Sequence, residues 1–449
     1  MTVLCRFAPS PTGFLHVGNI RAAIVNFLYC KKLGGEFMLR LDDTDDSRST
    51  DEFRDMIIED MKWLGLDFTS LVKQSQRFDK YEIAKNALIK SGRLYECFES
   101  DTDLKMQRKN QMAAGQRPLY NRHALNLSLE EKQKLRDQGK TPYYRFLLED
   151  KKVSWQDKIR GEIEYQGIHF SDPVVFRENG VPTYTFCSVV DDLEFGVTDV
   201  IRGEDHITNT AIQIQIFEAL IEAGFSGKIP DFAHLSLVKA LEGKISKREG
   251  GFDVKTLREA GIESLALFNL LAQIGTSRPI NIYKNFDELA QDFDFSIYSK
   301  SSMNYDLDEV QIINHKLLQI LDFEDVQGRL SEIGASDIDK NFYENIKPNL
   351  NLLSDILLWS DICNKSFRYE NAIEDKEFLK QVVQLLPQDT KDKDCWSKLL
   401  SEVKKITDRK GKSLFMPIRL ALTGVHSGPE MNALINLISR DEIIARLSN

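Results

Sequence analysis

The chain has 449 residues, of which 42 % are hydrophobic and 29 % are charged, a composition typical of soluble globular proteins with two to four domains. No apolar run is long enough to span a membrane, and "MTVLCRFAPS" lacks the basic and apolar regions of a signal peptide. The formal net charge of −10 disfavours a nucleic-acid partner unless basic residues gather in local patches. The six cysteines lack CxxC spacing, which favours reduced thiols in the cytoplasm over a disulfide framework.

The first 35 residues predict a strand, a loop and a helix. Apolar residues alternate over residues 3–7 and then recur at helical spacing from Asn19 until Gly34. The segment between them, "RFAPSPTGFLHVG", leads into a helix N-terminus, whose unpaired amides and positive dipole end suit a phosphate. Gly18 would let a phosphate approach the backbone closely. No Walker lysine or GxGxxG pattern is present, and taken alone the segment also fits an ordinary strand-to-helix loop.

A second strand, residues 37–42, ends in a group of acids, Asp42, Asp43, Asp45 and Asp46. Ser49 and Glu52 are spaced as a capping box before a further helical pattern. Strand, helix, strand and helix in succession predict a parallel sheet, which binds ligands at the carboxyl ends of its strands. A metal site formed by the four acids is one interpretation, but ammonium recognition and charge at the helix start are favoured.

The later chain changes character at several points. Residues 94–181 begin with basic residues and continue with β-like runs, as an insertion would. The glycine-flanked segment "GKISKREGG", residues 243–251, has two lysines three positions apart and on its own is typical of a surface loop. Helical patterns dominate from Asp253 onward. A basic cluster in this tail consists of Lys404, Lys405, Arg409, Lys410 and Lys412.

Two short motifs together resemble a known family. His16-Val17-Gly18-Asn19 and Lys244-Ile245-Ser246-Lys247-Arg248 resemble the HIGH and KMSKS motifs of class I aminoacyl-tRNA synthetases. The segments "RFAPSPTGFLHVG", "RLDDTD", "TYTFCSVVDD", "GVTDVIRGEDH" and "ISKR" follow the order and spacing of bacterial glutamyl-tRNA synthetases. The resemblance extends from Arg6 to "LFMPIRLALTG" near the end of the chain.

The resemblance implies an α/β fold, in which a Rossmann-like parallel-sheet catalytic domain carries an α/β insertion and is followed by an all-α anticodon-binding region. The implied boundaries are 1–93 and 182–252 for the two catalytic halves, 94–181 for the inserted acceptor-end-binding domain, 253–306 for a helical stem-contact region and 307–449 for the anticodon-binding region.

The resemblance also implies the reaction. Glutamate attacks the α-phosphorus of ATP, pyrophosphate leaves, and the glutamyl group then passes to the 3′ end of tRNA(Glu). Positioning and charge stabilisation perform the first step, and Mg²⁺ accompanies ATP. The implied catalytic residues are His16, Lys244 and Lys247, and the implied ATP-binding residues are Pro9, Ser10, His16, Gly18, Asn19, Lys244, Ser246 and Lys247.

Glutamate recognition maps onto both catalytic halves. The implied glutamate-binding residues are Arg6, Ala8, Ser10, Asp42, Tyr184, Ser188 and Arg202. Two arginines suit the two carboxylates of glutamate, and an acid suits its ammonium group. Two positions depart from the family: most relatives have glutamate in place of Asp42, and many have asparagine in place of Ser188. Glutaminyl-tRNA synthetases share the "LDD" form but lack an arginine at the position of Arg202 and carry an acid at that of Ser10, so glutamate is favoured.

The implied nucleic-acid partner is tRNA(Glu), with tRNA(Gln) left open, and the basic cluster in the tail is the candidate contact. We expect a monomer without membrane association. Structural zinc is not expected, because only Cys97 and the distant His123 resemble the ligands of zinc-containing relatives. The alternatives are a small-molecule nucleotidyltransferase and a non-catalytic RNA-binding relative. Pyrophosphate exchange with and without tRNA distinguishes the three.

Overall fold

A computed structural model describes residues 2–45, 48–240, 253–370 and 373–449. The chain forms two compact units. The first consists of Met1–Glu259 and Leu267–Leu307, and the second of Ala260–Ala266 and Asp308–Asn449. No helix among the described residues has the length and apolar character needed to cross a membrane.

The first unit is built on a seven-stranded sheet with the order β3-β2-β1-β9-β10-β6-β7. Neighbouring strands are parallel except at one edge, where β7 runs antiparallel to β6. The predicted parallel α/β architecture is therefore confirmed. The strands are β1 (Leu4–Phe7), β2 (Glu36–Leu41), β3 (Ser70–Lys73), β6 (Lys152–Asp157), β7 (Gly161–Gln166), β9 (Asp199–Gly203) and β10 (Asp231–Leu235).

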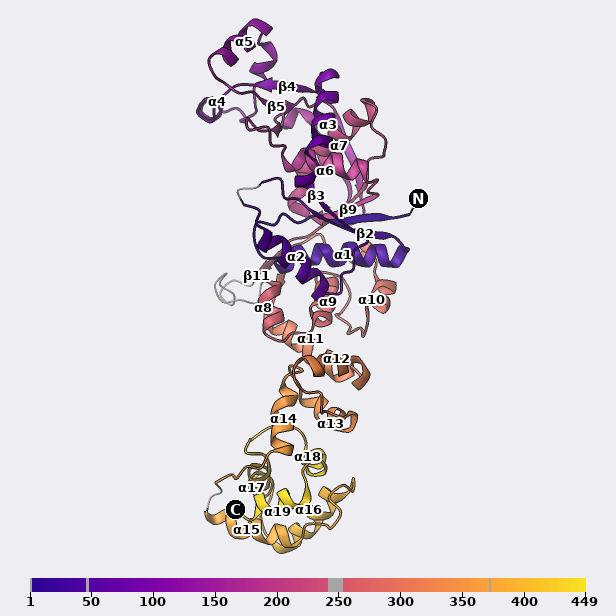
Figure 1. The fold of residues 1–449 in the computed structure, drawn as a ribbon, viewed down its shortest axis with the longest axis vertical. Helices are drawn as coiled ribbons and strands as arrows, with labels where there is room; N and C mark the ends of the chain where they lie inside the picture. Colours follow the sequence, from indigo (N-terminus) through magenta and orange to yellow (C-terminus); the bar gives the residue numbers. More distant parts are fainter. Residues whose placement is uncertain (1, 46–47, 241–252, 371–372) are drawn as a thin grey trace. The chain divides into compact units, whose positions relative to one another are not determined.

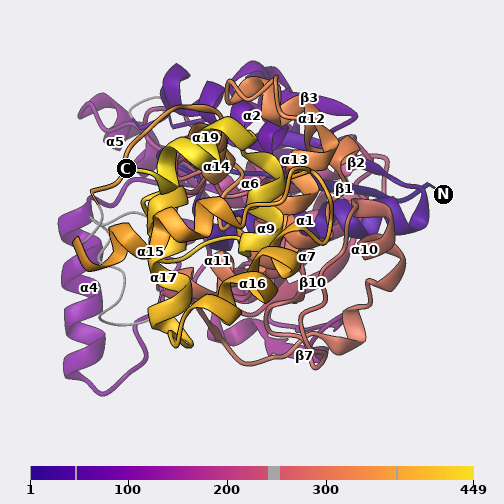
Figure 2. The same ribbon diagram turned by 90° about the horizontal axis from the view of Figure 1, so that it is seen from below.

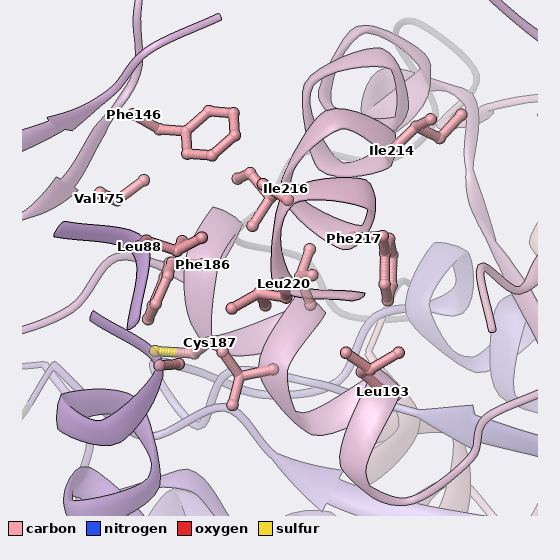
Figure 3. Close-up of a cluster of buried hydrophobic side chains, with 14 of the residues drawn as sticks. Leu88, Phe146, Val175, Phe186, Cys187, Leu193, Ile214, Ile216, Phe217 and Leu220 are labelled. Carbon is pink, nitrogen blue, oxygen red and sulfur yellow. The ribbon is translucent and has the colours of Figure 1, made fainter. Parts of the chain in front are cut away.

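Helices cover both faces of this sheet (Figure 1). On one face, α1 (Val17–Leu33) packs against β1, β2 and β9. On the other face, α3 (Phe78–Lys90), α6 (Tyr184–Glu194) and α7 (Ile207–Glu222) bury an apolar core that includes Leu88, Phe186 and Phe217 (Figure 3). The first unit also contains α2 (Asp51–Trp63), α8 (Val254–Glu259), α10 (Phe286–Asp292) and the parallel pair β11 (Val238–Ala240) and β12 (Met303–Tyr305).

Two helix starts differ from the sequence prediction. The first helix begins at Val17, two residues before Asn19, because the imidazole of His16 caps it; it ends as predicted at Gly34, which adopts the left-handed conformation. The predicted capping box of Ser49 and Glu52 is wrong. Thr50 is the N-cap of α2, and its hydroxyl accepts from the amide of Phe53. Ser49 and Thr50 are both typical N-cap residues, so the sequence does not distinguish them. The backbone conformation determines which of the two hydroxyls reaches the free amides of the helix.

A small antiparallel sheet with the order β4-β5-β8 lies within the predicted insertion. It consists of β4 (Leu94–Cys97), β5 (Tyr143–Phe146) and β8 (Val174–Phe176), accompanied by α4 (Asp101–Ala113) and α5 (Leu129–Asp137). Residues 152–166, which lie within the predicted insertion in sequence, instead extend the seven-stranded sheet as β6 and β7.

The second unit is helical, in agreement with the all-α expectation. Within it, α15, α17 and α19 pack side by side (Figure 2). Two helices, α9 (Ser264–Gln273) and α11 (Leu307–Ile320), contribute residues to both units. The remaining helices are α12 (Phe323–Glu332), α13 (Lys340–Ile346), α14 (Asp355–Asn364), α15 (Ile373–Gln384), α16 (Cys395–Ile406), α17 (Lys412–Thr423), α18 (Met431–Leu437) and α19 (Arg440–Leu447).

Candidate active site

A cavity of about 230 Å³ opens at the carboxyl ends of β1, β9 and β10, beside the N-terminus of α1. The chain continues from β1 to β2 on one side, while β9 lies on the other side, so the cavity occupies a switch point of the sheet order. The predicted residues that line it are Arg6, Ala8, Pro9, His16, Gly18, Asn19, Tyr184 and Arg202. Ser10, Asp42 and Ser188 are not among the lining residues.

The N-terminus of α1 is closed by His16. Its backbone is extended, and its Nδ1 accepts a hydrogen bond of 3.1 Å from the amide of Gly18. The side chain of Asn19 accepts in return from the amide of His16 at 3.4 Å. A Cβ atom on Gly18 would lie 2.9 Å from Cε1 of the imidazole, so the glycine makes room for the histidine itself. No acidic residue lies in the first turn, and the positive end of the helix dipole therefore stays available to an anion.

Arg6 on β1 is held by a buried carboxylate. Its Nε and Nη2 donate to the two oxygens of Asp192 on α6, at 3.1 and 3.3 Å. Arg40 on β2 donates to the same carboxylate at 2.6 Å. Burial alone would raise the pKa of Asp192, but the two guanidinium groups hold it below its usual value. This carboxylate thus fixes one edge of Arg6 while the arginine remains part of the cavity wall.

Asp42 lies at the end of β2, as predicted, but its partner is a protein side chain. Its two carboxylate oxygens accept from Nε and Nη2 of Arg40 at 2.7 and 3.2 Å. The residue is only 6 % exposed, and burial raises its pKa to about 6 although Arg40 opposes the shift.

Arg202 on β9 is 7 % exposed and lines the cavity. Its Nη1 donates to the hydroxyl of Tyr184 at 3.1 Å, and its Nη2 donates to the side-chain oxygens of Thr210 and Gln213 at 2.6 and 2.7 Å. All three acceptors are neutral. Among the described residues no carboxylate forms an ion pair with Arg202, and its Nε is buried without a hydrogen-bond partner. Burial lowers the pKa of Arg202.

Neither of the two acids that follow Arg202 closely in the sequence forms an ion pair with it. Glu204 pairs with Arg160, and Asp205 lies beside His206. Ser188 on α6 is a second buried group in need of a partner, because its hydroxyl has none within the part of the chain that the structure describes. Buried polar groups are normally hydrogen-bonded, so a buried hydroxyl without a partner calls for an explanation.

Several site residues escape sequence reasoning. His206 lines the cavity, its ring 5.5 Å from that of Tyr184; burial and the charge of Arg202 lower its pKa to about 4, so it is neutral near pH 7. Three further residues do not line the cavity but hold its arginines or their partner carboxylate in place: Arg40, Asp192 and Thr210. The one available signal is the acidic pair Asp191-Asp192 inside the otherwise apolar run of α6.

The predicted residues Lys244, Ser246 and Lys247 lie outside the described residues. The basic cluster of the tail lies in the helical unit. Lys404, Lys410 and Lys412 are exposed, Lys405 pairs with Glu402, and Arg409 pairs with Asp375 and lies over the ring of Phe378.

In the inserted sheet, the sulfur of Cys97 lies 3.5 Å from the hydroxyl of Tyr120, which donates to Glu99 at 2.7 Å. Over the described ranges, no group of three or more His, Cys, Asp or Glu side chains is arranged to hold a metal ion.

Comparison with known proteins identifies the family. The catalytic domain of class I tRNA synthetases (E and Q) matches residues 2–312, and an anticodon binding domain matches residues 318–449. The chain is 48 % identical over 448 residues to "Glutamate--tRNA ligase 2" of Rickettsia canadensis (strain McKiel), covering 99 % of each chain. It is 47 % identical to "Glutamate--tRNA ligase 1" of Rickettsia felis, covering 100 % of this chain and 99 % of the relative.

A solved structure agrees with these relatives. The crystal structure of a glutamate tRNA ligase from Elizabethkingia meningosepticum CCUG26117 in complex with its amino acid is 26 % identical, with a TM-score of 0.83. The match covers 100 % of this chain and 98 % of that chain. The resemblance drawn from the sequence motifs is thereby confirmed, and the chain belongs to the glutamate–tRNA ligase family of class I tRNA synthetases.

Proposed function

We propose that this enzyme activates L-glutamate with ATP, releasing pyrophosphate, and transfers the glutamyl group to the 3′-terminal adenosine of tRNA(Glu). The names of the relatives at 47–48 % identity support the reaction. The solved relative was crystallised with its amino acid, which supports an amino-acid site in the same fold.

The observation that favours glutamate as the amino acid is that Arg202 is buried and bonded only to neutral acceptors. A buried cation is costly unless an anion compensates it, and the described residues supply only neutral acceptors. The side-chain carboxylate of glutamate provides the missing charge. The amide of glutamine offers only a dipole in its place, so glutamate binds more tightly.

The rest of the substrate is assigned to neighbouring residues. Arg6, fixed by Asp192, faces the α-carboxylate, and Asp42 attracts the ammonium group. The main chain at Ala8 and the hydroxyls of Ser10, Tyr184 and Ser188 complete the proposed contacts. The unpartnered hydroxyl of Ser188 supports this arrangement.

ATP is placed beside α1. Its phosphates meet the amides at the helix N-terminus and the imidazole of His16, with Pro9, Gly18 and Asn19 of the cavity wall around them. Ser10, which does not line the cavity, is the further proposed contact. Because Nδ1 accepts from Gly18, the imidazole donates from Nε2 to a phosphate oxygen as negative charge develops. Lys244, Ser246 and Lys247 complete the phosphate site in this proposal. ATP enters as its magnesium complex, and Mg²⁺ is held mainly by phosphate and water, because among the described residues Asp205 is the only carboxylate in the cavity wall.

The helical unit is proposed to bind the anticodon, with Lys404, Lys405, Arg409, Lys410 and Lys412 contacting phosphates. The enzyme acts as a monomer in the cytoplasm, where the six buried free thiols remain reduced. Charging purified tRNA(Glu) and tRNA(Gln) separately determines whether the second tRNA is also a substrate.

The test of the proposed function is Arg202→Ala. Removing a charge-assisted hydrogen bond worth about 1.5–3 kcal/mol lowers kcat/KM for glutamate at least about tenfold. Discrimination against glutamine weakens, while the KM for ATP changes little. The measurement is kcat/KM for both amino acids in wild type and variant. An unchanged ratio between the two amino acids assigns side-chain recognition to another residue.

A further inference from the structure

Arg202 is held in place by a part of the molecule that does not line the cavity. Its Nη2 donates to Oγ1 of Thr210 at 2.6 Å and to Oε1 of Gln213 at 2.7 Å. Both acceptors are buried on α7 and lie one turn apart. Neither belongs to the cavity wall, so they act on the substrate only through the arginine.

Thr210 is itself restrained by a buried chain of hydrogen bonds. Its Oγ1 lies 2.9 Å from Nε2 of His234, and Nδ1 of His234 lies 2.5 Å from Oδ2 of Asp157. Asp157 is anchored in turn, because its Oδ1 accepts from the amides of Ile159, Arg160 and His234. The chain of hydrogen bonds thus runs from Asp157 at the end of β6, through His234 on β10 and Thr210 on α7, to Arg202 on β9.

The carboxylate of Asp157 determines which group donates and which accepts in each of these hydrogen bonds. The carboxylate of Asp157 accepts the proton on Nδ1 of His234, which leaves Nε2 as an acceptor for the hydroxyl of Thr210. Burial and the charge of Arg202 lower the pKa of His234, which keeps the imidazole neutral. With its proton directed at His234 instead of the carbonyl of His206, 3.2 Å away, Thr210 presents oxygen lone pairs to Arg202.

We propose that Thr210, oriented by His234 and Asp157, is a positioning residue for recognition of the substrate side chain: it fixes the plane of the Arg202 guanidinium so that its remaining donors face the bound carboxylate. This inference rests on the proposed glutamate specificity. A long arginine side chain must be held within a fraction of an ångström to aim its remaining N–H groups at a carboxylate, and the two hydrogen bonds that Nη2 donates supply that restraint.

The test compares four full-length enzymes in glutamate-dependent ATP–pyrophosphate exchange with tRNA present. Thr210→Val keeps the volume but removes the acceptor, Thr210→Ser keeps the hydroxyl, and Thr208→Val makes the same change at an exposed position of α7. We expect the Thr210→Val enzyme to raise the KM for glutamate at least about tenfold, with the KM for ATP and kcat within about twofold of wild type. The serine variant stays within about threefold of wild type, and the Thr208 control is unchanged.

A second pair of variants tests the hydrogen bonds that His234 forms with Thr210 and Asp157. This pair also replaces the first test if Thr210→Val fails to fold. His234→Gln places a side-chain oxygen near the position of Nε2, whereas His234→Asn reaches only the Asp157 side. The asparagine variant raises the KM for glutamate more than the glutamine variant does. Equal effects, or a KM for ATP that rises in parallel, overturn the positioning role. Wild-type enzyme without any glutamate-dependent exchange overturns the proposed function instead, and the inference with it.

Discussion

The hydrogen bond from Gly18 to His16 connects the sequence motif to the reaction. It uses Nδ1 of the imidazole to cap α1, and the proposed donor toward ATP is therefore Nε2. The glycine is needed because a Cβ at this position would lie within 3.0 Å of two imidazole atoms. One short-range contact therefore explains why histidine and glycine occur two positions apart.

This geometry predicts the effect of two substitutions. His16→Ala removes the donor to the developing charge, and Gly18→Ala displaces the imidazole, so each slows glutamate-dependent ATP–pyrophosphate exchange by about 100-fold or more. The KM for glutamate is expected to move much less, because the proposed glutamate site does not include either residue. Steady-state exchange kinetics measure both quantities. Near-wild-type exchange in either variant contradicts the role of His16.

Asp42 predicts a pH dependence. Burial raises its pKa to about 6, above the ordinary value of 3.8, so the side chain is ionised above pH 6 and protonated below it. The attraction proposed between this carboxylate and the ammonium group of glutamate is therefore present above pH 6 and is lost as the pH falls through that value. We expect kcat/KM for glutamate to fall between pH 7.5 and 5 with a midpoint near 6.

The control is Asp42→Asn, which removes the titrating group. Its kcat/KM for glutamate is low and has no inflection near pH 6. An equally steep profile in this variant assigns the titration to another group and removes Asp42 from ammonium recognition.

Among the helices, α19 depends on one carboxylate. Glu442 accepts from Nε of Arg446 at 2.7 Å, from Nη1 of Arg368 at 2.9 Å and from the hydroxyl of Ser366 at 2.9 Å. Burial alone would raise its pKa, but these partners lower it to about 2. Because the folded-state pKa lies below the ordinary value of 4.5, the stabilisation is complete above pH 4.5 and is lost as the pH falls toward 2.

We therefore expect Glu442→Gln to reduce the free energy of unfolding of the helical unit by about 1 kcal/mol at pH 7 and 5, and by less at pH 3.5. Urea unfolding at the three pH values measures the difference. Glu324→Gln is the control, because Glu324 forms an exposed pair with Lys340 and its loss has little effect. A difference that stays constant down to pH 3.5 contradicts the ion-pair explanation.

The sequence predicts individual helices and strands better than it predicts the contacts between residues that are far apart in the sequence. Strand β1, helix α1 and the motif at its start are visible because each depends on neighbouring residues. The pairing of Arg6 with Asp192 joins residues 186 positions apart and has no local signal. Likewise, the alternating pattern of residues 152–166 identifies strands but cannot show which sheet they join.

The same limit applies to the candidate site. The motifs locate His16, Gly18, Tyr184 and Arg202, all of which line the cavity. They do not show that Arg202 has neutral partners or that Asp42 is bound to Arg40, because these properties arise from packing between strands and helices distant in sequence.

For the whole molecule, the division into two units predicts the behaviour of a fragment ending at Asp306. It retains the first unit almost complete and is expected to bind ATP and glutamate but to lose most of its tRNA affinity. The salt dependence of the remaining tRNA binding becomes weaker, because fewer phosphates are neutralised. Binding titrations at two or more salt concentrations measure both effects, and a fragment that charges tRNA as well as the full chain refutes the assignment of the helical unit.

The fragment is expected to expose a residue that is buried in the full chain and therefore to aggregate. Residues 260–266 belong to the second unit, where the amide of Glu263 donates to Asn314 and its carboxylate pairs with Arg329. Truncation removes both partners and exposes Ile262, which is buried in the full chain. Replacing Ile262 by a polar residue in the fragment keeps the binding test independent of aggregation.

The pairing of β1 with β9 has a consequence for synthesis of the chain on the ribosome. Where the two strands meet, the amide of Leu4 donates to the hydroxyl of Thr198, and the amide of Thr198 donates to the carbonyl of Leu4. These hydrogen bonds join residues 194 positions apart, so β1 cannot complete its place in the sheet until more than two hundred residues have been translated. The small sheet β4-β5-β8 lies wholly within residues 94–176 and can pair earlier. Contacts between distant residues slow folding, and unsatisfied apolar strands attract other chains while they wait. The nascent enzyme is therefore expected to expose β1 and α1 to chaperones until β9 emerges, and to fold around an insertion that is already formed.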